Sequence, residues 1–102
     1  MAVVLDNNSA VSPSVMSGTF AGTTAAQTIT IGFRPNWIIW WNLTDGDDVN
    51  FWHNSVTTTF INVAAAAATI TATITVTDHG FVLPTDADGN ENAKTYAFIA
   101  GR

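Results

Sequence analysis

The sequence predicts an all-β chain, folded as a single-domain antiparallel β-sandwich or small barrel, jelly-roll-like, of about seven to eight short strands. Three observations lead to this fold class. Apolar and polar residues alternate with a period of two in several segments, turn residues recur about every eight to twelve positions, and no segment has the periodicity of an amphipathic helix. A length of 102 residues suits one domain. We expect the sandwich to span residues 15–102.

Residues 1–14 lack this alternation. They contain several Asn and Ser residues and a proline, so we expect them to form an arm or loop outside the main sheet. The next two segments, residues 15–23 and 26–33, are predicted strands. In the second of them, Ile29 and Ile31 alternate with threonines, which is typical of a strand with one buried face.

The stretch "WIIWWN" is the most apolar part of the chain and holds three of its four tryptophans. Successive side chains of a strand point to opposite faces, so Trp37, Ile39 and Trp41 are predicted to share one face. Ile38 and Trp40 share the other. Because both faces are apolar, each must be covered. We expect one face to fill the sandwich core and the other to pack against a second subunit or to close the second sheet.

Turn residues separate the later strands. The Asp45-Gly46 dipeptide is typical of a tight hairpin, so residues 37–43 and 49–53 are predicted to be antiparallel neighbours. A second Asp-Gly pair lies in a polar loop that precedes the last predicted strand, over residues 94–100.

The remaining predicted strands are residues 60–63 and 69–78. In the second, apolar residues alternate with threonines along the whole segment, which predicts a half-buried strand. The alanine run at residues 64–68 is shorter than the roughly 12 residues that an isolated helix needs. We expect a single helical turn or a bend there.

The charge balance excludes some partners. Eight acidic and three basic residues give a net charge of -5, and Arg34, Lys94 and Arg102 are far apart in the sequence. We therefore expect no nucleic-acid partner, because binding of phosphates needs clustered cations. The sequence shows neither a secretory signal nor an apolar run of about 20 residues, so we expect a soluble protein made in the cytoplasm, with no membrane partner.

The residues that carry chemistry are few and scattered. The chain has His53, His79 and Glu91 but no cysteine, and no sequence pattern joins a nucleophile, a base and an orienting group. Aspartates that could pair for acid and base catalysis lie in a hairpin loop, where solvated turn residues are common. We predict that the protein is not an enzyme and has no catalytic residue.

Two acidic loops offer oxygen ligands of the kind that calcium prefers. One contains Asp45, Asp47 and Asp48, and the other spans residues 86–92. Neither matches the spacing of the twelve-residue calcium loop, and polar turns have the same composition. The sequence therefore predicts no metal or cofactor site and leaves calcium binding at these loops open.

The aromatic residues have two interpretations. They could form a platform for sugars, or they could build the core and an oligomer interface, where aromatic side chains bury large areas. The tryptophans are concentrated in an apolar strand rather than in polar loops, which favours the core or the interface. The residues concerned are Trp37, Trp40, Trp41, Trp52 and Tyr96.

From residue 32 onward the chain resembles small structural proteins of tailed bacteriophages. The resemblance rests on "GFRPNWIIWWNLTDGDDVNFWHN" and, after a spacer, on "ITVTDHGFVLPTDADGNENAKTYAFIAGR". In this group a "GF-x-P" entry leads to an aromatic strand ending in "NLTDG", and an "ITVTD-x-GF" strand precedes a last aromatic strand that ends in a basic residue. The alanine run departs from the more polar, glycine-containing spacer of the group.

The resemblance implies a virion component without enzymatic activity, most like a capsid decoration (cement) protein. Such proteins sit on the outer capsid surface, usually as homotrimers, and tie neighbouring capsid subunits together. The implied partners are the major capsid protein and other copies of the chain. A tail or head-fibre subunit and a carbohydrate-binding β-sandwich module are the alternatives. The arm supplies the candidate capsid contacts, namely Val3, Val4, Leu5, Val11 and Pro13.

Overall fold

The computed structural model describes residues 4–5, 14–55, 59–63, 68–83, 85 and 89–102, with side chains at all of these except 4–5 and 68–73. These residues form ten strands and no helix. The described part of the chain thus contains no helix long and apolar enough to cross a membrane.

The strands form two antiparallel sheets, which confirms the predicted β-sandwich. The larger sheet has the order β1-β2-β10-β4-β5-β6-β7, and the smaller has the order β3-β9-β8. The larger sheet consists of β1 Val4–Leu5, β2 Val15–Ala21, β10 Thr95–Gly101, β4 Trp37–Asn42, β5 Asp47–His53, β6 Thr59–Val63 and β7 Ala68–Thr73. The smaller sheet consists of β3 Gln27–Thr30, β9 Gly80–Leu83 and β8 Thr75–Thr77.

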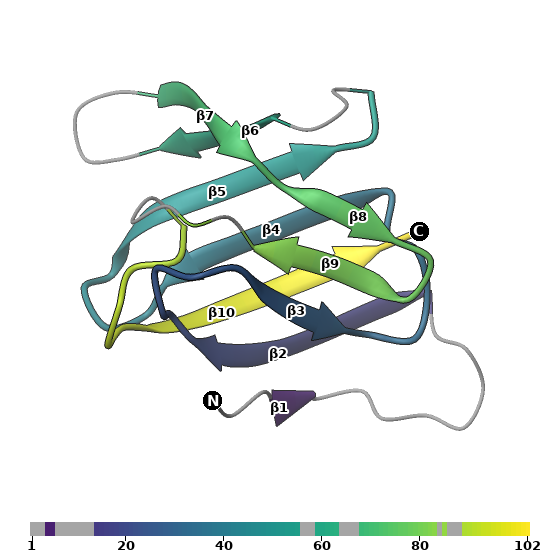
Figure 1. Cartoon of the computed structure of the whole chain (residues 1–102), viewed down its shortest axis with the longest axis horizontal. Helices are drawn as coiled ribbons and strands as arrows, with labels where there is room; N and C mark the ends of the chain where they lie inside the picture. The colour runs from purple at the N-terminus through teal and green to yellow at the C-terminus, as the bar shows by residue number, and fades with distance from the viewer. Residues whose placement is uncertain (1–3, 6–13, 56–58, 64–67, 84, 86–88) are drawn as a thin grey trace.

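The smaller sheet covers only part of the larger one. Figure 1 shows β3, β9 and β8 lying in front of β2, β10 and β4, whereas β5 and β6 continue beyond them. Rings from both sheets meet in the core, where Phe81 of β9 packs edge-on against Phe98 of β10 with ring centroids 5.7 Å apart. Within the larger sheet, Phe20 and Tyr96 stack at 5.2 Å.

The Asp-Gly hairpin is confirmed. β4 and β5 pair in antiparallel fashion, and Gly46 has a φ of 69°, a conformation that glycine adopts readily. The register shifts between Trp40 and Asn42, which marks a β-bulge beside the turn.

The segment 69–78, predicted as a single strand, is divided in the structure. β7 belongs to the larger sheet and β8 to the smaller, and the chain crosses between the sheets at Ile74. Ile74 is fully buried, so the crossing is anchored in the core. Alternation alone could not reveal the crossing, because a strand keeps its period of two when it changes sheet. The short strand β9 was also not predicted, since it offers only four residues of pattern.

The N-terminal segment differs in part from the expectation that it lies outside the main sheet. Val4 and Leu5 form β1, which pairs with Thr19 and Gly18 of β2 at the edge of the larger sheet. The other candidate capsid contacts, Val3, Val11 and Pro13, lie outside the described residues, as do residues 64–67 of the alanine run.

Candidate interaction surface

The side chains of β4 point alternately into and out of the sandwich, as predicted. Ile38 and Trp40 are fully buried on the inner face. Trp37, Ile39 and Trp41 are half-buried on the outer face, which the smaller sheet does not cover. The three tryptophans of this strand therefore serve two different surfaces.

The remaining predicted aromatic residues belong to the core. Trp40 packs against Phe60 with ring centroids 4.9 Å apart, and its Nε1 donates a hydrogen bond to the backbone oxygen of Gly89 at 2.9 Å. Trp52 is 3% exposed and Tyr96 is fully buried. The indole N–H of Trp40 thus has a hydrogen-bond partner although the side chain is fully buried.

Three asparagines of the larger sheet also point inward, and all are nearly or fully buried: Asn42, Asn50 and Asn62. The Nδ2 of Asn50 donates to the backbone oxygens of Trp40 and Asp48, at 3.3 and 2.8 Å. The Nδ2 of Asn62 donates to the Oδ1 of Asn50 and to the carboxylate of Asp48. Buried amides are tolerated where their hydrogen bonds are made, so this network fixes the inner side of β5 and β6 beside the bulge.

On the outer face of the same strands, apolar side chains meet solvent. Val49 and Phe51 of β5 are 41% and 39% exposed, and Ile61 and Val63 of β6 are 40% and 46% exposed. They continue the outer residues of β4 and β10. We call this surface the outer patch, which consists of Trp37, Ile39, Trp41, Val49, Phe51, Ile61, Val63 and Ile99.

The outer patch has a continuous row at its centre. Ile99 of β10 is the register partner of Ile39, Ile39 of Phe51, and Phe51 of Ile61. Directly opposed side chains on one face of a sheet touch one another, so four apolar residues cross four strands without interruption. Large contiguous apolar patches on a protein surface mark sites of interaction.

A tight aromatic contact flattens one end of the patch. The indole of Trp37 lies over Gly101 of the neighbouring strand β10, and a Cβ atom at Gly101 would collide with its ring. The absence of a side chain at Gly101 therefore lets the Trp37 ring lie down on the sheet instead of standing away from it.

Few charges interrupt the outer face. At the outward positions of β2, β10, β4, β5 and β6, the ionisable side chains are those of Asp47 and His53, at opposite ends of β5. Other acidic groups lie elsewhere: Asp45 pairs with Lys94 at 3.2 Å, and Asp78 pairs with Arg34 at 3.5 Å. The centre of the outer patch is thus uncharged.

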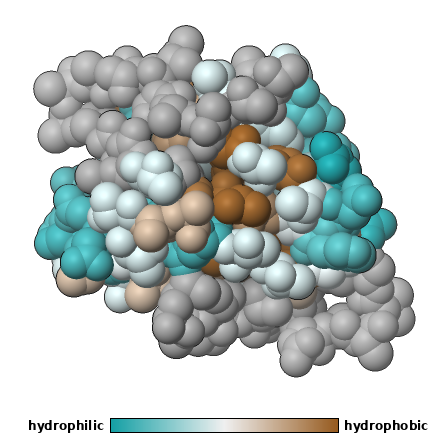
Figure 2. All heavy atoms as spheres, viewed as in Figure 1, coloured by the Kyte–Doolittle hydropathy of each residue, from teal (hydrophilic) through white to brown (hydrophobic). Residues whose placement is uncertain are grey.

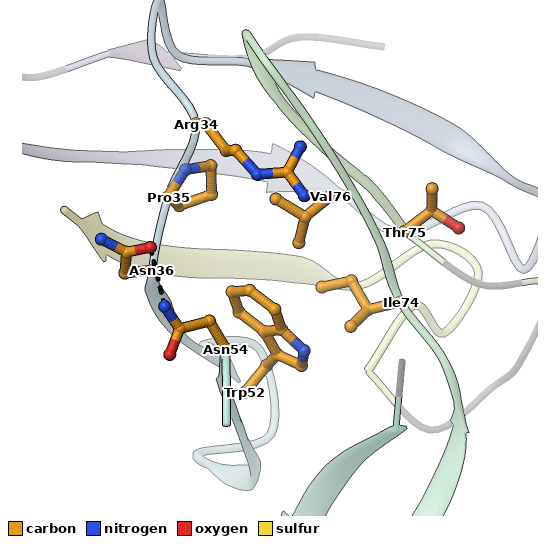
Figure 3. Close-up of a pocket in the computed structure, with 8 residues that line it drawn as sticks. All are labelled: Arg34, Pro35, Asn36, Trp52, Asn54, Ile74, Thr75 and Val76. Atoms are coloured by element: carbon orange, nitrogen blue, oxygen red, sulfur yellow. Dashed lines mark hydrogen bonds between the residues drawn. The ribbon is translucent and has the colours of Figure 1, made fainter. Parts of the chain in front are cut away.

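A separate cavity of about 460 Å³ opens between β5 and the segment that enters β8. Figure 3 shows the Trp52 ring and the Arg34 side chain approaching Ile74 and Val76, while Asn36 and Asn54 lie at the side of the cavity. The Nδ2 of Asn54 donates to the Oδ1 of Asn36 at 2.9 Å. Figure 2, in the same view as Figure 1, shows hydrophobic residues in the middle of the face that carries the smaller sheet and hydrophilic residues at both ends. The volume is within the range of small-ligand sites.

The candidate metal loops approach each other at one end of the sandwich. The backbone N–H of Gly89 donates to the Oδ2 of Asp48 at 3.4 Å, while residues 86–88 lie outside the described residues. Within the described ranges, no three His, Asp or Glu side chains converge so that they could hold a metal ion. His53 contacts Ser55, with 2.9 Å between Nδ1 and Oγ, but both residues are exposed.

Among the described residues, the fold clearly shifts the titration of Tyr96. Desolvation by burial raises its pKa from the ordinary value of 10.0 to about 12, although a hydrogen bond from the backbone N–H of Glu91 opposes this shift. The phenol is therefore a neutral part of the core at physiological pH.

Sequence reasoning identified the outer residues of β4 but missed those of β5 and β6. Val49, Phe51, Ile61 and Val63 alternate with Asn50 and Asn62, so a period of two was present. Polar residues usually face solvent, and this rule assigns the two faces the wrong way round. Comparisons of the chain with protein-family models, curated proteins and solved structures find no match.

Proposed function

We propose that the protein is a non-enzymatic structural subunit of a tailed-bacteriophage virion. Its role is that of a capsid decoration (cement) protein, which binds the outer capsid surface as a homotrimer and stabilises the shell. The observation that carries the proposal is the outer patch, because an assembly subunit needs a contiguous surface that becomes dry on association. The resemblance of residues 32–102 to phage structural proteins supplies the setting.

The arrangement of the fold suits attachment to a lattice. An oligomer that presents several identical contacts binds a repeating surface by avidity, so each contact can be weak. The N-terminal segment supplies these contacts with the major capsid protein in this proposal, and β1, at the edge of the larger sheet, holds the segment against β2. A net charge of -5 keeps free subunits soluble before they bind.

The proposal is tested with capsid shells of the encoding phage that lack their decoration layer. The purified protein should sediment with these shells and raise the temperature at which they fall apart. A variant without residues 1–14 should keep its oligomeric mass and its thermal unfolding but bind the shells less well. Failure of the full chain to bind shells would contradict the proposal, and full occupancy by the shortened chain would contradict the role of the arm.

A tail or head-fibre subunit is the nearest alternative within the same setting. Antibodies against the protein, imaged on intact virions, separate the two positions. Labelling spread over the shell supports a decoration protein, whereas labelling restricted to the tail or to single fibres supports the alternative.

The cavity beside Trp52 favours a second candidate function, the binding of a saccharide. Its wall combines an indole, two amides and the Arg34 guanidinium, groups that can pack against and hydrogen-bond to a sugar. Added saccharides should then change the tryptophan fluorescence, and Trp52→Phe should reduce the change. An unchanged spectrum across a panel of neutral and acidic sugars would remove this candidate.

A further inference from the structure

We propose that the outer patch is covered by the outer patches of other copies of this chain, so that it forms the self-association interface and not the capsid contact. This inference rests on the proposed function, in which the free protein is an oligomer. In a trimer, three copies would gather their patches around a common axis, with the central row of each facing its neighbours.

The first argument is the inverted polarity of β5 and β6. Asn50 and Asn62 are buried, whereas Phe51 and Ile61 on the opposite face are exposed. Burial of these adjacent apolar side chains away from water would be favourable. One partner surface that covers both strands would bury all of them at once. The sheet presents such a surface, because register pairs hold these side chains in one row.

The second argument is charge. Two copies that each carry a net charge of -5 repel one another over most of their surface. The outer patch lets two copies approach without bringing carboxylates together at its centre, since Asp47 lies at one end of β5.

The third argument is size. From β2 to β6 the outer face spans five strands, and the longest of these have seven residues. With strand spacing of about 4.8 Å and a rise of about 3.3 Å per residue, the face measures about 24 by 23 Å, or about 550 Å². If the faces of neighbouring copies together cover this face completely, the contact buries about 1,100 Å² counted over both sides, which is close to the roughly 1,000 Å² expected of a specific interface.

The test compares one added charge on each face of the sandwich. Phe51→Glu places a carboxylate at the centre of the outer patch, and Thr28→Glu places one at an exposed position of β3 in the smaller sheet. Phe51→Thr removes the aromatic ring but keeps a residue suited to a strand, in case the charged variant does not fold. Circular dichroism and thermal unfolding check the fold, and light scattering with sedimentation over a dilution series gives the mass.

The wild-type protein and Thr28→Glu should both be oligomers, with a mass of at least twice the 10.8 kDa of the monomer. Phe51→Glu should be a monomer, and Phe51→Thr should raise the Kd of association at least about tenfold. A wild-type protein that is monomeric at its highest soluble concentration would overturn the inference. Equal association of Phe51→Glu, or of a folded Phe51→Thr, and Thr28→Glu would also overturn it.

Binding to shells separates this inference from the proposed function. A self-associating protein that fails to bind shells leaves the inference standing and removes the proposed function. A monomeric wild-type protein whose binding to shells is abolished by Phe51→Glu would show that the patch contacts the capsid, which overturns the inference and supports only the capsid-binding part of the proposed function.

Discussion

The two faces of the larger sheet follow opposite rules where β4, β5 and β6 lie side by side. On the inner face, Trp40, Asn50 and Asn62 are consecutive register partners, and all three are buried. On the outer face, the adjacent row includes Phe51 and Ile61, which are about 40% exposed. The buried row thus contains two amides, while the row nearer to solvent is entirely apolar.

This difference shows that the most hydrophobic row of this sheet is not the most buried one. Burial marks the row that stabilises the single chain, and exposed hydrophobicity marks the row that is available for association. The inner row is held by a ring contact and by directed hydrogen bonds, which specify one arrangement within the single chain. The outer row has apolar contacts alone, and these can be completed only by another surface. Variants of the two rows should therefore separate stability of the chain from its association.

The largest effect is expected from Trp40→Ala on the inner row. Removal of a fully buried indole leaves a cavity and should lower the free energy of unfolding by about 3–5 kcal/mol. Urea denaturation followed by circular dichroism measures the loss. A loss below about 1 kcal/mol would mean that the inner row is not the main source of stability.

Asn50→Ala breaks the amide network without removing a ring. The backbone oxygens of Trp40 and Asp48 and the amide of Asn62 each lose a partner, so we expect a loss of about 1–3 kcal/mol. The same denaturation experiment applies. Unchanged stability would show that water or another group replaces the Asn50 side chain.

High pH should weaken the inner face through Tyr96, the sole tyrosine of the chain. Its pKa is raised by folding, so the folded state retains the proton more strongly than the unfolded state. The associated stability is fully present below pH 10 and is lost as the pH rises towards about 12. We expect a decrease of at most about 3 kcal/mol, the free energy that corresponds to a rise of the pKa from 10.0 to about 12.

Two controls accompany this titration. Ultraviolet absorbance of the tyrosinate reports the ionisation directly, because no second phenol contributes. Tyr96→Phe should abolish this part of the pH dependence, while its lost hydrogen bond to Glu91 lowers stability at every pH. Ionisation near the ordinary value of 10.0 in the folded protein would contradict the raised pKa.

The smallest effect on the single chain is expected from Trp41→Ala. Trp41 follows Trp40 in sequence but is half-buried on the outer face, so its removal should lower the free energy of unfolding of the monomer by about 1 kcal/mol or less. The oligomer should be weakened more than the monomer. Denaturation at low and high protein concentration measures both, and equal losses at both concentrations would remove the distinction between the faces.

Much of the fold could be predicted from local pattern. The strands predicted from the sequence overlap β2 to β6 and β10, and the Asp45-Gly46 turn predicted one pair of neighbours. The crossing at Ile74 could not be found, because leaving one sheet for the other does not change the period of the pattern. Pairing of β10 with both β2 and β4 is long-range and leaves no local signal.

The outer patch was predicted only in β4, where the residues on both faces of the strand are apolar. For Trp37 and Trp41, an apolar strand with two apolar faces predicted a second cover in addition to the core. For Phe51 and Ile61 no orientation was predicted, because asparagines alternate with the apolar residues and buried amides are stable only with partners, which here lie on other strands. Such partners can be recognised once the strands are placed in register.

The position of β10 also constrains the order in which the molecule can fold. β10 is inserted between β2 and β4, two strands that precede it by more than half of the chain. The β4-to-β7 meander can pair as it leaves the ribosome, but β2 must wait for residues 95–101 before it gains its inner neighbour. Completion of the sheet therefore depends on contacts of high sequence separation, which slow folding.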